Sequence, residues 1–109
     1  MNLMWLATLA FVWFTFSGAP AVTQSEPQSS RVLALGGSVT EIVYALGEGD
    51  RLIGRDSTST HPSDALDLAN VGYVRALSPE GVLSIEPDLI IAIEGSGPPE
   101  AVEVLQAAD

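Results

Sequence analysis

The sequence predicts an α/β fold, a three-layer Rossmann-like lobe built on a short parallel sheet. From residue 31 onward, short apolar runs alternate with amphipathic stretches that are long enough to hold a crossover helix. The runs are apolar throughout rather than at every second position, which is typical of parallel strands covered on both faces. Strands and helices that alternate in this way favour a parallel sheet with helices packed on its faces.

The first strand is expected over residues 31–35, RVLAL, with a helix directly after the Gly-Gly pair that follows it. Ser38 and Glu41 have the spacing of a capping box, in which each side chain accepts a hydrogen bond from the other residue's backbone N–H. Gly47 is placed to end this helix in the left-handed conformation. Strand and helix together form the first repeat of the lobe.

The second strand is expected over residues 51–55, RLIGR, and the third over residues 88–93, DLIIAI. Between them, Ser78 and Pro79 favour a helix start, because serine is a good N-cap and proline suits the first helical position. A last helix is expected over residues 100–108. Three strands make a thin sheet, so we expect the last helix and at least one sheet edge to stay partly uncovered. The lobe is therefore interpreted as incomplete.

The N-terminal part differs from the rest. Residues 3–16 are almost wholly apolar and lead into Ala19, Pro20 and Ala21, the pattern of a secretory signal peptide cleaved after Ala21. The apolar run is shorter than the roughly 20 residues that span a bilayer. An uncleaved anchor remains the alternative, because no Lys or Arg precedes the run. We therefore expect a signal peptide at 1–21 and a polar tether at 22–30.

Charge and composition exclude several functions. The 4 Lys plus Arg against 14 Asp plus Glu give a net charge of −10, which argues against nucleic acid or an anionic membrane as a partner. The chain has no cysteine, so it has no disulfide, thiolate metal site or cysteine nucleophile. No acid–base pair or activated nucleophile is evident in the sequence, so an enzyme is not expected.

Three stretches carry a family resemblance: GGSVTEIVYALG at 36–47, GRDSTS at 54–59 and VGYVRALSPEG at 71–81. The chain from residue 31 to about 105 resembles the N-terminal lobe of periplasmic haem-binding proteins of ABC haem importers. These proteins belong to a class that also holds vitamin B12 and siderophore carriers, and they bind haem between two lobes. The resemblance implies that residues 31–109 form a partial N-terminal lobe and that the protein is periplasmic.

By this resemblance, Tyr73 matches the tyrosine that coordinates haem iron. A phenolate is a hard oxygen donor that suits ferric iron. A phenol is ordinarily protonated at neutral pH, so ligation requires the charge of the iron or of a nearby cation. Arg75 is the candidate cation, and it could instead pair with a haem propionate. Without the resemblance, a Tyr-x-Arg pattern is more typical of an ordinary loop with an exposed arginine.

Other residues are expected at the same site. Gly72 allows the backbone to approach a flat ligand closely, and Val74 is expected to supply apolar wall. Arg55 and Ser57 follow the second strand, at the sheet edge where α/β proteins bind ligands, and are expected to line the cleft. Their alternative interpretation is a loop whose polar groups are solvated or paired locally.

Glu100 is the candidate for docking to the transporter. In this class, an acidic residue on the outer surface of each lobe contacts arginines of the permease. The dipole of the last helix alone also favours a carboxylate at this position. The expected partners are therefore haem and an ABC importer permease, with membrane contact only through the permease or an uncleaved signal segment.

The sequence leads to three functional hypotheses. The first is non-catalytic binding of ferric haem for import. The second is a vitamin B12 or ferric-siderophore lobe of the same class. The third is a fragment of an α/β nucleotide-binding enzyme that uses the helix start after the Gly-Gly pair, although this pair matches neither G-x-G-x-x-G nor a P-loop.

Overall fold

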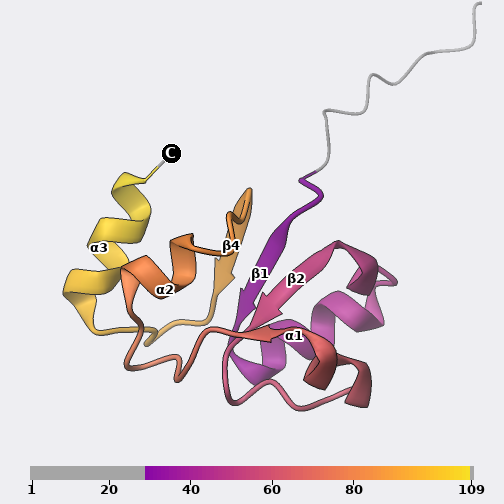
Figure 1. Ribbon diagram of the computed structural model, residues 1–109. Coiled ribbons are helices and arrows are strands. Elements are labelled where there is room, and N and C mark those ends of the chain that lie inside the picture. Colours follow the sequence, from indigo (N-terminus) through magenta and orange to yellow (C-terminus); the bar gives the residue numbers. More distant parts are fainter. Residues whose placement is uncertain (1–28, 109) are drawn as a thin grey trace, which may run out of the picture.

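The computed structural model describes residues 29–108 (Figure 1). The expected signal peptide, with its cleavage site after Ala21, and most of the expected tether lie outside this range. No helix within residues 29–108 has the length and apolar character needed to span a bilayer. The elements in chain order are β1 (Val32–Leu35), α1 (Gly37–Ala45), η1 (Gly49–Arg51), β2 (Leu52–Arg55), η2 (Ser63–Asp67), β3 (Ala69–Asn70), α2 (Pro79–Leu83), β4 (Leu89–Ala92) and α3 (Pro99–Ala107).

The sheet is parallel and has four strands in the order β3-β2-β1-β4. The expectation of three strands was wrong by one, because β3 is only two residues long and both are exposed. Such a strand carries no apolar run to indicate it, and it forms by pairing with Gly54 and Arg55 of β2. The chain runs outward from β1 to β2 and then returns to place β4 on the other side of β1. The strand order therefore reverses between β1 and β4.

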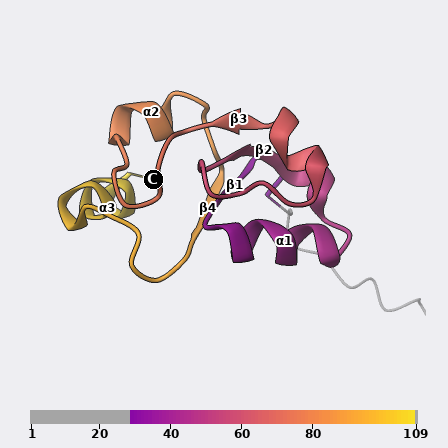
Figure 2. The same cartoon turned by 90° about the horizontal axis from the view of Figure 1, so that it is seen from below.

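Helices cover both faces of the sheet, which confirms the α/β layers predicted from the sequence. In Figure 2, α1 lies on one side of the strands and α2 and α3 lie on the other. Side chains of β1 alternate between the two layers: Val32 and Ala34 pack toward α1, while Leu33 and Leu35 pack toward α2 and α3. All four are buried. β1 therefore contributes side chains to both apolar cores.

The start of α1 differs from the expected capping box. Gly36 is the N-cap, no side chain caps the helix, and Ser38 lies within its first turn. Gly36 has a φ of 111°, and a Cβ at this position would lie 2.7 Å from Cγ2 of Ile93. The tight turn after β1 therefore starts the helix earlier than the Ser38 and Glu41 pattern implies.

Two other expected helix signals are confirmed. The Oγ of Ser78 accepts a hydrogen bond from the N–H of Gly81 at 3.3 Å, and Pro79 is the first residue of α2. Gly47 has a φ of 76° directly after the C-cap of α1. Both signals are local to the chain, so they can be recognised without knowledge of the fold.

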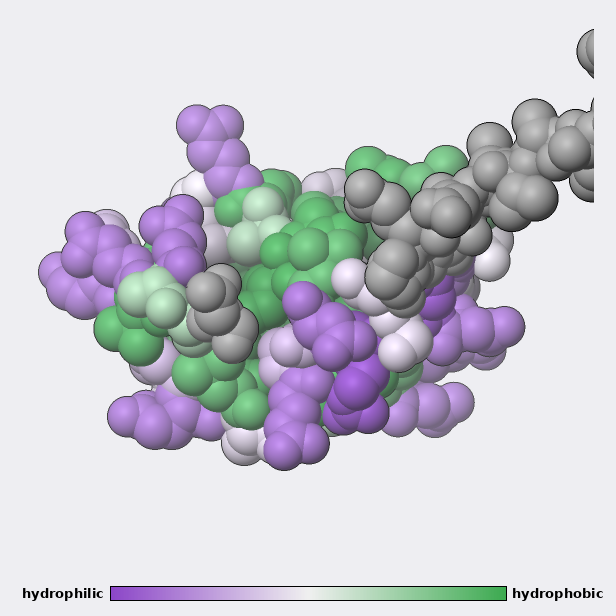
Figure 3. All heavy atoms as spheres, turned by 90° about the horizontal axis from the view of Figure 1, so that it is seen from above, coloured by the Kyte–Doolittle hydropathy of each residue, from purple (hydrophilic) through white to green (hydrophobic). Residues whose placement is uncertain are grey.

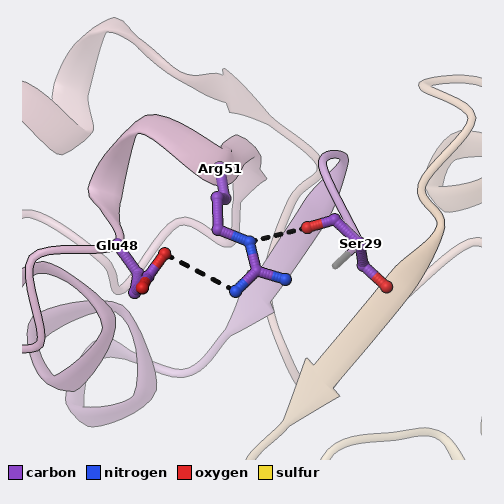
Figure 4. A network of polar contacts seen from close by, with 3 residues as sticks. All are labelled: Ser29, Glu48 and Arg51. Carbon is purple, nitrogen blue, oxygen red and sulfur yellow. Dashed lines mark hydrogen bonds and ion pairs between the residues drawn. The ribbon is translucent and has the colours of Figure 1, made fainter. Parts of the chain in front are cut away.

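Arg51 lies in η1 rather than in the strand where it was expected, and it secures the entry to the lobe (Figure 4). Its Nε donates to the carbonyl of Ser29 at 2.6 Å, and its NH1 lies 3.5 Å from Oε2 of Glu48. A partly exposed ion pair of this kind contributes about 1 kcal/mol or less. The hydrogen bond to Ser29 holds the segment before β1 against the turn before β2.

Candidate ligand-binding site

A hollow of about 240 Å³ lies where the strands end. Segments that follow β1, β2, β3 and β4 all contribute to it, because the carboxyl ends of parallel strands meet at one edge of the sheet. The order of the strands reverses next to this hollow, as it does at ligand sites of open α/β sheets. The lining residues are Gly36, Gly37, Thr58, Tyr73, Val74, Arg75, Ile93, Glu94 and Gly95.

Tyr73 combines a restrained backbone with an open side chain. The N–H of Ser57 donates to the carbonyl of Gly72 at 2.8 Å, and the N–H of Gly97 donates to the carbonyl of Val74 at 3.0 Å. The residues on either side of Tyr73 are thus tied to two different loops. The Tyr73 side chain itself is 50% exposed. The phenol is therefore presented to solvent from a fixed position on the rim.

Gly72 leaves the space beside Tyr73 open. Its φ is 102°, and a Cβ built at this position would meet no atom within 4 Å. Its N–H donates to Oδ1 of Asn70 at 2.9 Å, which helps to hold this turn. Gly72 does not itself line the hollow, and the close approach of a flat ligand to the backbone here stays a prediction.

Arg75 is exposed and lines the same hollow. No ion pair or side-chain hydrogen bond engages its guanidinium within the part of the chain that the structure describes. Glu94, after β4, brings one negative charge to the lining. Because arginine is always protonated, the Arg75 group is a full positive charge on the rim.

The apolar lining differs from the expectation. Val74 lines the hollow, but its side chain is buried in the core beside α2 and α3, so it forms floor rather than wall. The exposed apolar residue is Ile93, which the sequence placed inside the last strand. β4 ends at Ala92, and Ile93 directly after it donates its N–H to the carbonyl of Leu35 at 2.9 Å and lines the hollow.

Arg55 and Ser57 do not line the hollow. Arg55 is buried, and its NH1 donates to the carbonyls of Asp56 at 3.3 Å and Ser59 at 3.2 Å. Ser57 is exposed and contributes through its backbone N–H, and Thr58 is the loop residue that reaches the lining. The pairing of β2 with β3 buries the Arg55 position, which a reading of the loop alone does not reveal.

Asp56 is the structural centre of the rim, and the sequence did not single it out. Its buried carboxylate accepts from the N–H of Gly36 at 2.9 Å, the N–H of Thr58 at 3.0 Å, and the hydroxyls of Thr58 and Ser59. Burial alone raises the pKa of Asp56, but the hydrogen bonds from Ser59, Thr58 and Gly36 outweigh burial and lower it. The carboxylate therefore stays ionised and joins the loop after β1 to the loop after β2.

The remaining candidates lie apart from the hollow. Glu100 is exposed in the first turn of α3, with Glu103 also exposed on the same helix. His61 is an exposed loop residue. Among residues 29–108, no group of three His, Cys, Asp or Glu side chains is arranged to hold a metal ion. Two oxygen donors of the hollow, the phenol of Tyr73 and the carboxylate of Glu94, suit a ferric centre by type.

Known proteins resemble this chain in sequence and in fold. Residues 32–109 match the periplasmic binding protein family. A periplasmic haem-binding protein of Roseiflexus sp. RS-1 is 45% identical, with a TM-score of 0.71 over 74% of this chain and 31% of that one. A periplasmic haem-binding protein of Pseudomonas aeruginosa is 43% identical, with a TM-score of 0.71 over 74% of this chain and 29% of that one. A vitamin B12-binding protein of Vibrio cholerae is 33% identical over 87 residues, which are 80% of this chain and 32% of that protein. The chain thus spans about a third of the length of these relatives.

Proposed function

The chain belongs to the periplasmic binding protein family, and we propose that it contributes to the binding of ferric haem, with Tyr73 as the iron ligand, for uptake by an ABC importer. Relatives in this family are transport proteins that bind a substrate and are not enzymes. The hypothesis of a nucleotide-binding enzyme is therefore set aside. The family also implies a periplasmic location, and cleavage after Ala21 is part of the proposal.

The observation that carries the proposal is the presentation of Tyr73. Its phenol is half exposed in a hollow at the carboxyl ends of the strands, while hydrogen bonds at Gly72 and Val74 restrain the backbone on both sides. A tyrosine that served only packing would have its ring in one of the two cores. This ring instead faces the place where α/β folds bind ligands.

The neighbours of Tyr73 suit a flat ligand with acidic side groups. Arg75 offers a fork of donors that matches a propionate carboxylate, or a positive charge that favours the phenolate form of Tyr73. A Cβ at Gly72 would face open space, and Ile93 supplies an exposed apolar surface for a macrocycle face. The iron, the propionates and the macrocycle of a haem would thus each meet a protein side chain of matching chemistry: Tyr73, Arg75 and Ile93.

Vitamin B12 is the main rival ligand, because relatives of about 33% identity bind it. Two haem-binding relatives are 45% and 43% identical, which supports haem. A ferric siderophore remains a further possibility within the same class. The role of Tyr73 separates these ligands, since a phenolate bond to iron leaves an absorption signature and an apolar contact does not.

One wall of a cleft is expected to bind weakly by itself. Typical pockets have about 300–1,000 Å³ and bury roughly 70–90% of a ligand, whereas the hollow has about 240 Å³. We therefore propose that haem contacts this chain on one side only. Tight binding is then a property of the two-lobed relatives, which are about three times as long.

Docking to the permease is the second part of the proposal. Glu100 is exposed on α3, outside the hollow, so a transporter could contact it while a ligand occupies the rim. Glu103 is the neighbouring carboxylate that offers the same charge. The test is to replace Glu100 with Gln and measure import in cells, with ligand binding as the control that should not change.

The test of the ligand is a titration of the whole chain with ferric haem and, separately, with cyanocobalamin, followed by visible absorption. The wild type should give a charge-transfer band of tyrosinate-bound ferric haem, and Tyr73→Phe should lose it. Tyr44→Phe is the matched control, because Tyr44 packs against the α1-side core. A haem spectrum that is unchanged in Tyr73→Phe, or a response to cyanocobalamin alone, would contradict the proposal.

A further inference from the structure

The hollow at the carboxyl ends of the strands is enclosed by segments that contact one another in turn. The loop after β2 meets the start of α1, since a Cβ built on Gly37 would lie 3.1 Å from the carbonyl oxygen of Thr58. The start of α1 meets the loop after β4, since a Cβ built on Gly36 would lie 2.7 Å from Cγ2 of Ile93. These close contacts fix three of the lining segments relative to one another.

The loop after β4 is also tied to the loop after β3. The N–H of Gly97 donates to the carbonyl of Val74 at 3.0 Å, and the N–H of Leu77 donates to the carbonyl of Gly97 at 2.9 Å. The loop after β3 returns to the loop after β2, because the N–H of Ser57 donates to the carbonyl of Gly72 at 2.8 Å. The four segments therefore form a closed ring, and the side chains on this ring start from fixed positions.

The ring carries one cation and one anion in the lining of the hollow. Arg75 follows β3 and Glu94 follows β4, and both residues are exposed. Within residues 29–108 the two side chains do not form an ion pair with each other, and no other charged side chain pairs with Glu94. A positive and a negative charge thus stand on the same rim, and neither is neutralised by the fold.

Arg75 is the cation that the fold leaves to a ligand. The chain has 4 Lys plus Arg, and three of them, Arg31, Arg51 and Arg55, donate from their side chains to backbone carbonyls. Arg75 holds no carboxylate in the part of the chain that the structure describes. Because a guanidinium pairs well with carboxylates, the acidic edge of a ligand is drawn to Arg75 on a chain whose net charge is −10.

Glu94 is the carboxylate that such a ligand meets. Asp56 also lies at the rim, but it is buried, and its oxygens accept hydrogen bonds from backbone and hydroxyl donors. Glu94 is exposed and lines the hollow itself. Like charges brought together at a binding surface disfavour the complex, so a ligand carboxylate next to Glu94 weakens binding.

We propose that Glu94 is a specificity-determining residue, which restricts the hollow to macrocycles whose carboxylates lie on one edge. This role rests on the proposed function of haem binding. In haem both propionates lie on one edge, so that edge can pair with Arg75 while the carboxylate-free remainder passes Glu94. A macrocycle with carboxylates all around would bring one of them to Glu94 in any orientation. Glu94 thus supplies the repulsive element of the specificity, and Arg75 supplies the attractive one.

The experiment titrates the whole chain with two ferric macrocycles and follows visible absorption. Ferric protoporphyrin IX has its propionates on one edge, whereas ferric coproporphyrin III has a propionate on every pyrrole ring. The wild type should prefer the protoporphyrin, and Glu94→Gln should lower this preference about fivefold, the upper range for one exposed pair of charges. At 1 M salt, where charges are screened beyond about 3 Å, the wild type and Glu94→Gln should show the same preference.

Glu100→Gln is the matched control, because it makes the same change in net charge on α3, outside the hollow. It should leave the preference unchanged. Arg75→Gln should weaken the binding of ferric protoporphyrin IX but not of its dimethyl ester, which has no free carboxylate. A preference that ignores Glu94→Gln, an equal change in Glu100→Gln, or no binding of either macrocycle would overturn this role of Glu94.

The same titrations separate this role from iron ligation by Tyr73. A complex that responds to Glu94→Gln but lacks the Tyr73-dependent band would contradict ligation and support the role of Glu94, and a complex with the band that ignores Glu94→Gln would do the reverse. Figure 3 shows an apolar area in the centre of the face on which the strands begin, bordered by hydrophilic side chains. A macrocycle that adhered to this area would respond to neither variant, and that result would overturn the role of Glu94.

Discussion

The rim around Tyr73 and the free edge of β4 are both exposed, but they differ in what they expose. At the rim, the backbone beside Tyr73 is hydrogen-bonded to neighbouring loops, and single side chains with distinct chemistry project from it. At the β4 edge, the side chains of residues 89–92 are all apolar, and within residues 29–108 the outer side of β4 pairs with no strand. The rim thus presents selected side chains on a hydrogen-bonded backbone, whereas the edge of β4 presents the backbone itself.

The largest expected loss of stability comes from replacing Asp56, whose hydrogen bonds join the loops after β1 and β2. Asp56→Ala removes the acceptor of two buried donors, the N–H of Gly36 and the hydroxyl of Ser59. We expect a loss of about 3 kcal/mol in the free energy of unfolding, since each orphaned buried donor costs about 1–3 kcal/mol. Urea denaturation measures the loss, and Glu103→Ala on the surface of α3 is the control. A loss below about 0.5 kcal/mol, the usual range of surface changes, would show that the rim is not held in this way.

The next largest loss of stability is expected at one of two glycines near the rim, Gly36 and Gly72, which both have a positive φ. Gly36→Ala should destabilise the chain by about 2 kcal/mol, because it adds a clash with Ile93 to the backbone strain. Gly72→Ala has open space around the new Cβ, so only the left-handed conformation costs about 1 kcal/mol. Thermal unfolding of the two variants gives the comparison. Equal losses would mean that the contact with Ile93 relaxes freely.

The pH dependence of stability also tests whether Asp56 holds the rim. Because the pKa of Asp56 is lower in the folded chain than in the unfolded one, its contribution is fully present above the unfolded value of about 3.9. It is lost as the pH falls from there through the folded pKa. Urea midpoints from pH 6 to pH 3 should therefore fall more steeply for the wild type than for Asp56→Asn. Parallel curves would show that other carboxylates dominate acid unfolding.

The smallest expected effect on stability is at Tyr73. Tyr73→Phe removes a hydroxyl from a half-exposed ring, so the free energy of unfolding should change by less than about 0.5 kcal/mol. The haem spectrum should change completely under the proposed function. Differential scanning fluorimetry on the protein used for the haem titration measures both properties. A large loss of stability would instead give Tyr73 a packing role.

Local chemistry made part of the fold predictable. β1 and β2 were expected because their apolar runs reflect burial on both faces, and β4 was expected from the same kind of run although most of its side chains are exposed. Ser78 and Gly47 act within a few residues of the chain. β3 was not predictable from its own residues, because it exists only through pairing with β2. The capping box failed since the turn at Gly36 depends on contact with Ile93, 57 positions later.

The sequence predicted the exposed residues of the site correctly as exposed, but it did not predict which polar residues are buried beneath them. Tyr73 and Arg75 meet at the hollow because they follow one strand within a few residues, whereas Gly72 precedes Tyr73 without lining it. Arg55 was expected to line the cleft, but the pairing of β2 with β3 buries it, and Asp56 is buried where it accepts from the N–H of Gly36 in the loop after β1. The signal that was available for Asp56 was its position in Asp-Ser-Thr-Ser, where nearby hydroxyls and N–H groups can reach one carboxylate.

The central position of β1 has a mechanical consequence. The chain enters β1 from the edge where the strands begin, and the hollow lies at the opposite edge (Figure 1). A pull on the segment before β1 would load that strand lengthwise between β2 and β4, both parallel to it. The ladders on its two sides would then be strained together in shear rather than opened one bond at a time. The lobe should therefore resist force best along the line that joins its entry point to its ligand rim.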